Sequence, residues 1–176
     1  MADFEVFLPL VLKFEGGFVN DPADPGGATN KGITLQTFRG CAQTLLGLDP
    51  TLANLKTLSD AQVGVIYRSL YWDKTGGDDT ASQNLANIVC DFYVNAGGNA
   101  TRLLQTILAG MGQALTVDGA IGPASVQALQ KVDQDEVYRK YKQGRIHYYQ
   151  NLAQKKPPLA KFLKGWLNRV NSFPDV

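Results

Sequence analysis

The stretch EGGFVNDPADPGGATNKGIT, residues 15–34, decides how the rest of the sequence is interpreted. It follows an apolar segment that runs to about Phe14, and Gly16-Gly17 is a typical place for a helix to end. Pro9 would cost about 3 kcal/mol inside a helix, so the helix either kinks there or begins there. Residues 18–33 are dense in turn formers, which predicts a shaped loop or a short irregular hairpin. Loops of this length in compact domains are often functional.

Glu15 is the candidate acid of this stretch. The chain has only three glutamates, and Glu15 alone lies at a predicted helix end followed by two glycines. Its apolar neighbours Phe14 and Phe18 favour desolvation, and the negative pole of the helix disfavours a carboxylate. Both effects favour the protonated form that a general acid needs. Position alone also fits an ordinary exposed glutamate at a helix end.

Two aspartates could assist Glu15. Glycoside hydrolysis generally needs a second polar group that places a water or stabilises the cationic sugar. Asp21 and Asp24 are both close in sequence, but each precedes a proline, and Asp-Pro is common in turns. A chemical role and a turn role therefore stay open for both.

The remaining pattern predicts an all-α fold. Ser59-Asp60-Ala61-Gln62 is a capping box, which opens a helix to about Trp72. Residues 115–122 alone suggest a little extended structure. Further helices are expected at 34–46, 82–96, 99–111, from Pro123, at 135–154 and up to Asn171.

A chain of 176 residues suits one domain, or one domain with a small appended lobe, and a soft boundary falls near Gly97-Gly98. Beyond it the chain becomes basic. Nine Lys or Arg and no acidic residue lie between Val137 and Asn171, although the net charge is only +1. This stretch is either a solvated helix face or a surface for the anionic cell envelope.

Several classes of enzyme are excluded. His147 is the only histidine, so a zinc amidase or metallopeptidase would lack ligands. Cys41 and Cys90 lie in apolar helical patterns, which favours buried free thiols over a disulfide or a catalytic nucleophile. The sequence contains no membrane-spanning run and no convincing signal peptide.

Residues 15–34 closely resemble the signature of glycoside hydrolase family 108, which consists of lysozyme-like muramidases and includes phage endolysins. The resemblance covers most of the chain. Ile66–Trp72 resembles the family's helix ending in Tyr-Trp, Cys90–Gly97 its central helix, and Asp118–Pro123 the start of its peptidoglycan-binding-like part, and Gly165–Arg169 also fits.

The resemblance implies a lysozyme-like fold with a small helical C-terminal lobe. Residues 1–97 would form the catalytic region, and residues 98–176 a peptidoglycan-binding-like helical region packed on it. The implied enzyme is a muramidase without metal or cofactor, with Glu15 as its catalytic acid, that cuts the bond from N-acetylmuramic acid to N-acetylglucosamine. A lytic transglycosylase and a non-catalytic module that binds peptidoglycan or activates secretion are the alternatives.

Phage lysozymes of another family space their site as Glu, eight residues, Asp, five residues, Thr. Asp24 stands at the second of these positions, which makes it a functional partner of Glu15, and Asn30 stands at the third instead of Thr. The group that positions the water therefore stays open among Thr29, Asn30 and Thr34.

Four further residues are candidates for binding substrate together with Thr34. Asp91 and Asn95 are spaced i, i+4 and share one helix face, where they could line the site or simply fix the helix. Trp72 and Tyr93 could stack on sugar rings, as could Tyr71, or belong to the core.

We expect a monomer that binds peptidoglycan and no nucleic acid, and residues 139–169 supply the basic side chains for an anionic surface. The resemblance to endolysins predicts synthesis in the host cytoplasm without a signal peptide and action on the wall after release.

Overall fold

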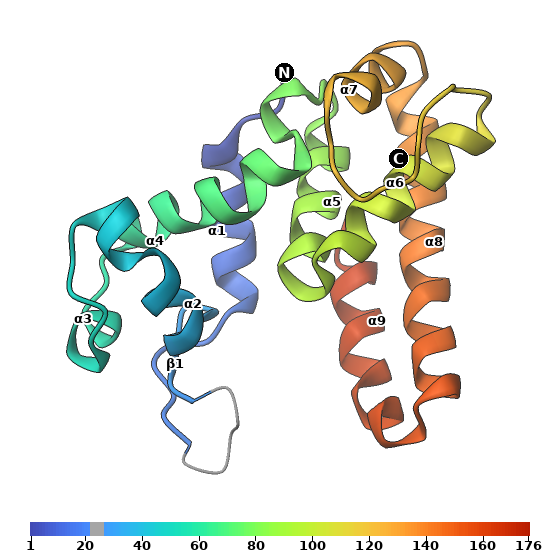
Figure 1. Cartoon of the computed structure of the whole chain (residues 1–176). Coiled ribbons are helices and arrows are strands. Elements are labelled where there is room, and N and C mark those ends of the chain that lie inside the picture. Colours follow the sequence, from blue (N-terminus) through green and yellow to red (C-terminus); the bar gives the residue numbers. More distant parts are fainter. Residues whose placement is uncertain (22–26) are drawn as a thin grey trace. The chain divides into compact units, whose positions relative to one another are not determined.

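The computed structural model describes residues 1–21 and 27–176, which are mostly helical (Figure 1). This confirms the predicted all-α class. The chain forms two compact units. One comprises Phe4–Leu70, and the other comprises Met1–Asp3 together with Tyr71–Val176.

The first unit combines short helices with a hairpin. Its first helix ends at Phe14, next to Glu15, and the hairpin follows at residues 29–34. The elements are α1 (Phe4–Phe14), β1 (Thr29–Asn30), β2 (Ile33–Thr34), α2 (Leu35–Cys41), the π-helical turn η1 (Ala42–Leu46), α3 (Leu52–Lys56) and α4 (Asp60–Tyr67). A second π-helical turn, η2 (Arg68–Trp72), continues α4 and contains the boundary between the units.

Helix α1 contains Pro9 in its interior, so the helix begins well before the proline. Phe4, Phe7 and Val11 are buried and recur at the spacing of one helical face. Pro9 lies on the exposed side of the helix. The apolar face thus stabilises α1 although Pro9 removes one backbone donor.

The loop of residues 18–33 contains a hairpin, which was one of the two predicted alternatives. Thr29 pairs with Thr34 and Asn30 with Ile33 in antiparallel register. The two residues of the turn, Lys31 and Gly32, have φ angles of 49° and 79°. Two positive φ values are what a type I′ turn requires, and its twist suits a two-residue hairpin.

Side chains cap the starts of α2 and α4. Thr34 accepts a hydrogen bond from the backbone N–H of Thr37 at the start of α2. The capping box of Ser59 and Gln62 forms at the start of α4 as predicted. Both caps satisfy backbone donors that a helix start leaves unpaired.

The second unit is a helical bundle. Helix α5 packs on α6 and α8, and α9 lies beside α8 (Figure 1). Helix α5 is buried on all sides over eight consecutive residues, 85–92, which include the expected apolar positions Leu85, Ile88, Val89 and Phe92. The elements are the 3-10 turns η3 (Asp73–Thr75) and η4 (Gly77–Asp79), then α5 (Gln83–Ala96), α6 (Gly98–Gly110), α7 (Pro123–Gln130), α8 (Gln134–Lys155), η5 (Pro157–Phe162) and α9 (Leu163–Asn171).

The expectation of extended structure at 115–122 was wrong, because this stretch contains no strand. Instead it forms a turn on the side chain of Gln105. The Gln105 amide accepts from the N–H of Gly119 and donates to Asp118 Oδ1 and the carbonyl of Ala120, at 2.7–2.9 Å. The bond from Gln105 lowers the pKa of the Asp118 carboxyl. Side-chain hydrogen bonds therefore replace the strand pairing. Among the helices described, none is long and apolar enough to cross a membrane.

Candidate active site

Glu15 directly follows α1 in the first unit. Its backbone N–H still donates to the carbonyl of Val11, at 3.2 Å, so the helical bonding extends to Glu15. The Glu15 side chain is half-buried, whereas the neighbouring Phe14 is 38% exposed. Phe18 is half-buried, and the ammonium of Lys56 lies 5.4 Å from the centre of its ring. The predicted apolar surroundings of Glu15 are thus only partly formed by its sequence neighbours.

The carboxyl group of Glu15 lies against the turn of the hairpin. A Cβ atom on Gly32 would stand 2.9 Å from both Cγ and Oε2 of Glu15. The same Cβ would stand 2.3 Å from the hydroxyl oxygen of Tyr67. The missing side chain of Gly32 therefore leaves room for both the Glu15 carboxyl and the Tyr67 hydroxyl next to the turn.

Tyr67 was not predicted as part of the site. It comes from α4, has no exposed surface, and donates its hydroxyl hydrogen to the carbonyl of Lys31 at 2.9 Å. The only sequence signal for it was its place in the segment Ile66–Trp72 that resembles the family. A buried tyrosine needs a partner for its hydroxyl, but sequence alone does not say which.

The side chain of Lys31 also fixes the turn. Its ammonium makes an ion pair with Asp60 and a hydrogen bond, at 3.3 Å, to the carbonyl of Leu58. Both partners lie at the start of α4. The turn is therefore held to α4 by Lys31 through its side chain and by Tyr67 through the backbone of Lys31.

Asn30, a predicted catalytic residue, is buried in β1. Its Nδ2 donates to the carbonyl of Leu55 at 2.8 Å and to that of Lys56 at 3.3 Å. These carbonyls belong to the end of α3, where a helix leaves acceptors unpaired. The amide N–H₂ of Asn30 thus ties the hairpin to α3, which leaves its Oδ1 as the group that could hold a water.

The other candidates of the first unit have different outcomes. Thr34, predicted to bind substrate or position water, uses its hydroxyl oxygen to cap α2 and is half-buried. The Val19–Thr29 bridge closes the loop, with both backbone bonds at 2.8 Å. Asp24 lies outside the described residues, so its catalytic role stays a prediction.

Trp72, which was predicted to stack on a sugar, belongs to the core of the second unit. Its side chain has no exposed surface, and its indole N–H donates to Asp78 Oδ1 at 2.8 Å. A Cβ on Gly77 would come within 2.2 Å of the ring. The structure thus supports the core alternative, because a ring without exposed surface offers no face to a sugar.

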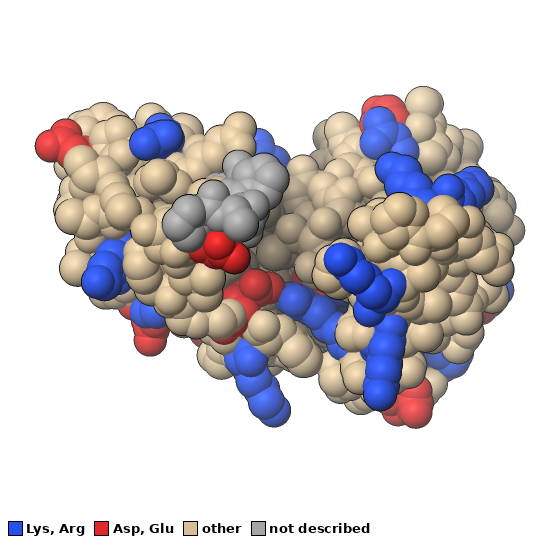
Figure 2. Space-filling view, turned by 90° about the horizontal axis from the view of Figure 1, so that it is seen from below, with Lys and Arg blue, Asp and Glu red and all other residues tan. Residues whose placement is uncertain are grey.

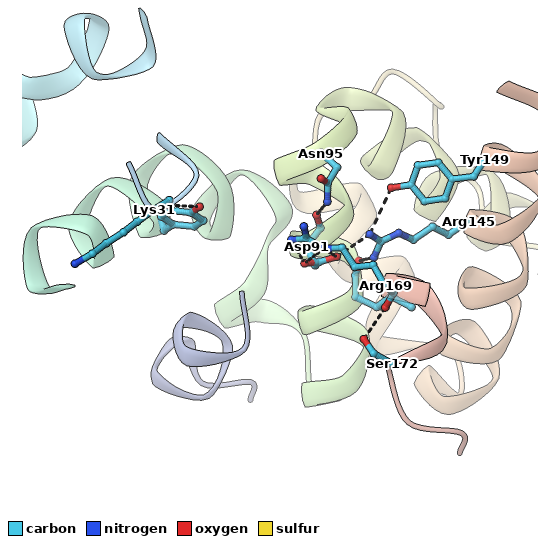
Figure 3. Close-up of polar contacts among 9 residues, drawn as sticks. Lys31, Asp91, Asn95, Arg145, Tyr149, Arg169 and Ser172 are labelled. Atoms are coloured by element: carbon cyan, nitrogen blue, oxygen red, sulfur yellow. Dashed lines mark hydrogen bonds and ion pairs between the residues drawn. The ribbon is translucent and has the colours of Figure 1, made fainter. Parts of the chain in front are cut away.

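Asp91 likewise belongs to the interior, not to a surface where substrate could bind (Figure 3). Its carboxylate makes ion pairs with Arg145 of α8 and Arg169 of α9, each at 2.7 Å. Asp91 and Arg145 have no exposed side-chain surface. The carboxylate therefore joins α5, α8 and α9 and is a structural group.

Asn95 and Tyr93 remain accessible on α5. Asn95 is exposed, and its side chain donates to the backbone carbonyl of Asp91 at 2.8 Å, a contact within the same helix. Tyr93 is half-buried and packs edge-on against Tyr71, with ring centres 6.4 Å apart. Both residues keep surface that could bind a glycan, and this role stays a prediction.

The two cysteines are free and buried, as predicted. Burial raises the pKa of both thiols, for Cys90 far above its ordinary value. A buried thiol with a raised pKa is a poor nucleophile. In residues 1–21 and 27–176, no group of three or more His, Cys, Asp or Glu is placed to hold a metal ion.

The nine cations of residues 137–171 divide into two groups, of which the first has acceptors within the second unit. Lys142 pairs with Asp175 at 2.7 Å, and Lys140 pairs with Glu136 at 3.4 Å. The other members of this group are Arg145 and Arg169, which contact Asp91, and Arg139, which donates to the carbonyl of Val176.

The remaining four cations lie where α8 passes through η5 into α9, and we call them the basic tip: Lys155, Lys156, Lys161 and Lys164. All four are exposed, and none makes an ion pair within the described part of the chain. Phe162 is 47% exposed among them, and the ammonium of Lys161 lies 5.0 Å from its ring centre. Figure 2 shows basic side chains spread over the visible face of this unit.

Comparisons with known proteins agree with the sequence pattern. Residues 8–97 match the glycosyl hydrolase 108 family, and residues 99–171 match a family described as a predicted peptidoglycan domain. The structure is similar to that of Brucella abortus SagA, with a TM-score of 0.76 and 32% sequence identity over 96% of this chain and 89% of that one. No curated protein matches the chain. The chain therefore belongs to the glycosyl hydrolase 108 family and carries a predicted peptidoglycan domain behind its hydrolase region.

Proposed function

We propose that the protein is an N-acetylmuramidase that hydrolyses the β-1,4 bond between N-acetylmuramic acid and N-acetylglucosamine in peptidoglycan. The observation that carries the proposal is the placement of Glu15. Its carboxyl lies at the end of α1 against the Lys31–Gly32 turn, inside the segment that matches the hydrolase family. The peptidoglycan domain behind it supports the choice of polymer.

In this reaction Glu15 donates its proton to the oxygen of the scissile bond, and the acetylglucosamine chain leaves. Water then adds at the anomeric carbon of the muramic acid, and the proton that it releases restores the protonated form of Glu15. Asp24 would support the positive charge that develops on the sugar, and Asn30 Oδ1 would accept a hydrogen bond from a water.

A wall-digestion assay tests this function. Wild-type protein should clear a suspension of purified walls, and mass spectrometry should find fragments with a new reducing end on muramic acid. A lytic transglycosylase would instead release anhydro-muramic fragments, which are lighter by one water. A module that only binds peptidoglycan would leave the suspension turbid.

Glu15→Gln is the decisive variant, because the amide keeps the shape of the side chain but cannot donate the proton. General acid catalysis contributes roughly 10²–10⁴-fold, so lysis should nearly stop while the fold persists. Glu5→Gln on the exposed side of the same helix is the matched control and should digest walls normally. A Glu15→Gln variant that keeps more than about a tenth of the wild-type rate would contradict the mechanism.

We further propose that the basic tip docks the enzyme on the anionic wall. Its four lysines are exposed without carboxylate partners in the described chain, and Phe162 adds an exposed apolar face beside them. Peptidoglycan stem peptides and wall polymers carry the complementary charge. The tip also lies inside the segment that matches the peptidoglycan domain.

A role as a phage endolysin follows from the resemblance alone, and we propose it on that ground. The enzyme would be made in the cytoplasm and reach the wall after the membrane is opened. Expression in a bacterium should therefore cause lysis only when a pore-forming holin is expressed with it. Lysis without a holin would favour an enzyme that is exported by other means.

A further inference from the structure

We propose that Gly32 and Tyr67 are positioning residues that set the place of the Glu15 carboxyl. This inference rests on the proposed function, in which Glu15 is the acid. Its basis is geometric: the hydroxyl oxygen of Tyr67 and Oε2 of Glu15 lie 2.3 and 2.9 Å from a single point, the place of the missing Cβ of Gly32.

Tyr67 is rigidly held, which makes it a suitable reference for Glu15. The tyrosine has no exposed surface, and its hydroxyl donates to the carbonyl of Lys31 at 2.9 Å. Close packing around a buried ring disfavours any other rotamer. The Tyr67 hydroxyl therefore fixes the position of the Lys31–Gly32 turn relative to α4. The position of this turn limits where the Glu15 side chain can lie.

Gly32 serves this arrangement in two ways. Its φ of 79° belongs to the left-handed region, which a type I′ turn needs at this position and glycine adopts without strain. Its missing side chain also lets the Glu15 carboxyl approach the backbone. A methyl group at this position would stand 2.3 Å from the hydroxyl of the buried Tyr67 and 2.9 Å from Glu15, so both the turn and the half-buried Glu15 side chain have to shift.

Displacing the Glu15 carboxyl should lower the catalytic rate more than the affinity for substrate. Proton donation depends on an oxygen placed within hydrogen-bond reach of the leaving group, and a misplacement of about 1 Å can cost on the order of 10²-fold in rate. Substrate affinity comes from the rest of the glycan contacts and does not depend on this placement. Errors at Gly32 and Tyr67 should therefore lower kcat and leave KM nearly unchanged.

The test compares Gly32→Ala with Gly47→Ala on soluble glycan chains prepared from peptidoglycan. Gly47 also has a positive φ, 65°, but nothing lies within 4 Å of its added Cβ. Both variants place alanine in the left-handed region, and only Gly32→Ala meets Glu15 and Tyr67. Expected are a fall in kcat of roughly 10²-fold for Gly32→Ala and a near wild-type kcat for Gly47→Ala.

Tyr67→Phe is the second variant, because it removes the hydroxyl with little change of packing. Its matched control is Tyr141→Phe in the other unit. Tyr141 is also fully buried and donates to a backbone carbonyl, that of Ala100, at 3.0 Å. Both variants should lose similar stability in denaturant, whereas kcat should fall about tenfold for Tyr67→Phe alone.

The double variant Gly32→Ala/Tyr67→Phe completes the cycle. Without the hydroxyl, the methyl group added at position 32 meets less resistance. The Gly32→Ala substitution should therefore lower kcat by a smaller factor in the Tyr67→Phe background than in the wild type.

Two results would overturn the proposal. One is a kcat of Tyr67→Phe equal to that of Tyr141→Phe in folded protein, and the other is a loss that appears in KM instead of kcat. Failure of the proposed function is seen separately, because the wild type would then leave the walls undigested or Glu15→Gln would remain active, whatever Gly32 and Tyr67 do.

Discussion

Asp91 of α5 and Arg145 of α8 form an ion pair at 2.7 Å in which neither side chain has any exposed surface. Arg169 of α9 approaches the same carboxylate, also at 2.7 Å, and is 16% exposed (Figure 3). One carboxylate thus connects three helices of the second unit. Removing it would leave two cations near each other in a dry interior, which is far less favourable than losing a pair at the surface.

We therefore predict that Asp91→Ala lowers the free energy of unfolding of this unit by about 3–5 kcal/mol. Glu136→Gln is the control, because the Glu136–Lys140 pair is about half exposed and should contribute less than about 1 kcal/mol. Chemical denaturation followed by circular dichroism measures both. Equal losses in the two variants would show that the Asp91 cluster contributes no more than a surface pair.

Asp24→Asn tests the second carboxylate of the proposed mechanism. If its charge stabilises the cationic sugar, the rate of wall digestion should fall on the order of 10²-fold, while binding of wall fragments persists. Asp21→Asn is the matched control, since Asp21 is also followed by proline in the same loop. A near wild-type rate for Asp24→Asn would reduce Asp24 to a turn residue and direct attention to Asp21 or Asn30.

Neutralising the basic tip should weaken binding to the wall without changing the rate of glycan cleavage at Glu15. With Lys155, Lys156, Lys161 and Lys164 all changed to Gln, binding to purified walls should weaken at least roughly tenfold, because each lysine near an anionic surface contributes about 1 kcal/mol. Activity on whole walls should fall, and cleavage of short soluble glycans should stay the same.

A control with the same net charge separates the tip from charge in general. Four exposed cations elsewhere serve this purpose when changed to Gln: Arg39, Lys74, Lys131 and Lys140. Binding by the wild type should also weaken as salt rises, because exposed charges are screened within about 8 Å at physiological ionic strength. Wild-type binding by the tip variant at low salt would show that the tip is only a solvated surface.

Chelation should not affect the enzyme. Saturating EDTA should leave wall digestion intact, because the proposed mechanism uses the proton of Glu15 and no metal-bound water. The experiment compares initial clearing rates with and without the chelator, followed by added zinc. Activity that disappears on chelation and returns with zinc would point to a metal-dependent amidase.

The sequence alone determined the secondary structure well. Glycine pairs, capping residues and prolines act locally, so the capping box at Ser59, the end of the long helix near Gln154 and the helix end near Phe14 could all be predicted. Glu15 could also be selected from sequence, because its motif is long and contiguous. The conformation of residues 115–122 could not be predicted, since it depends on hydrogen bonds to the side chain of Gln105 in α6.

Only the tertiary structure decided what the polar and aromatic candidates contact. Asp91 appears in the sequence as a residue able to bind a sugar, yet Arg145 and Arg169, 54 and 78 residues further along the chain, hold it in the interior. Trp72 appears in the same way, yet its side chain has no exposed surface. Tyr67 was not singled out in the sequence, and it lies near Glu15 because its hydroxyl, which comes from α4, donates to the hairpin turn at Lys31 beside Gly32. Local sequence fixes helix boundaries through nearby backbone bonds, whereas burial and pairing depend on long-range packing that no local pattern records.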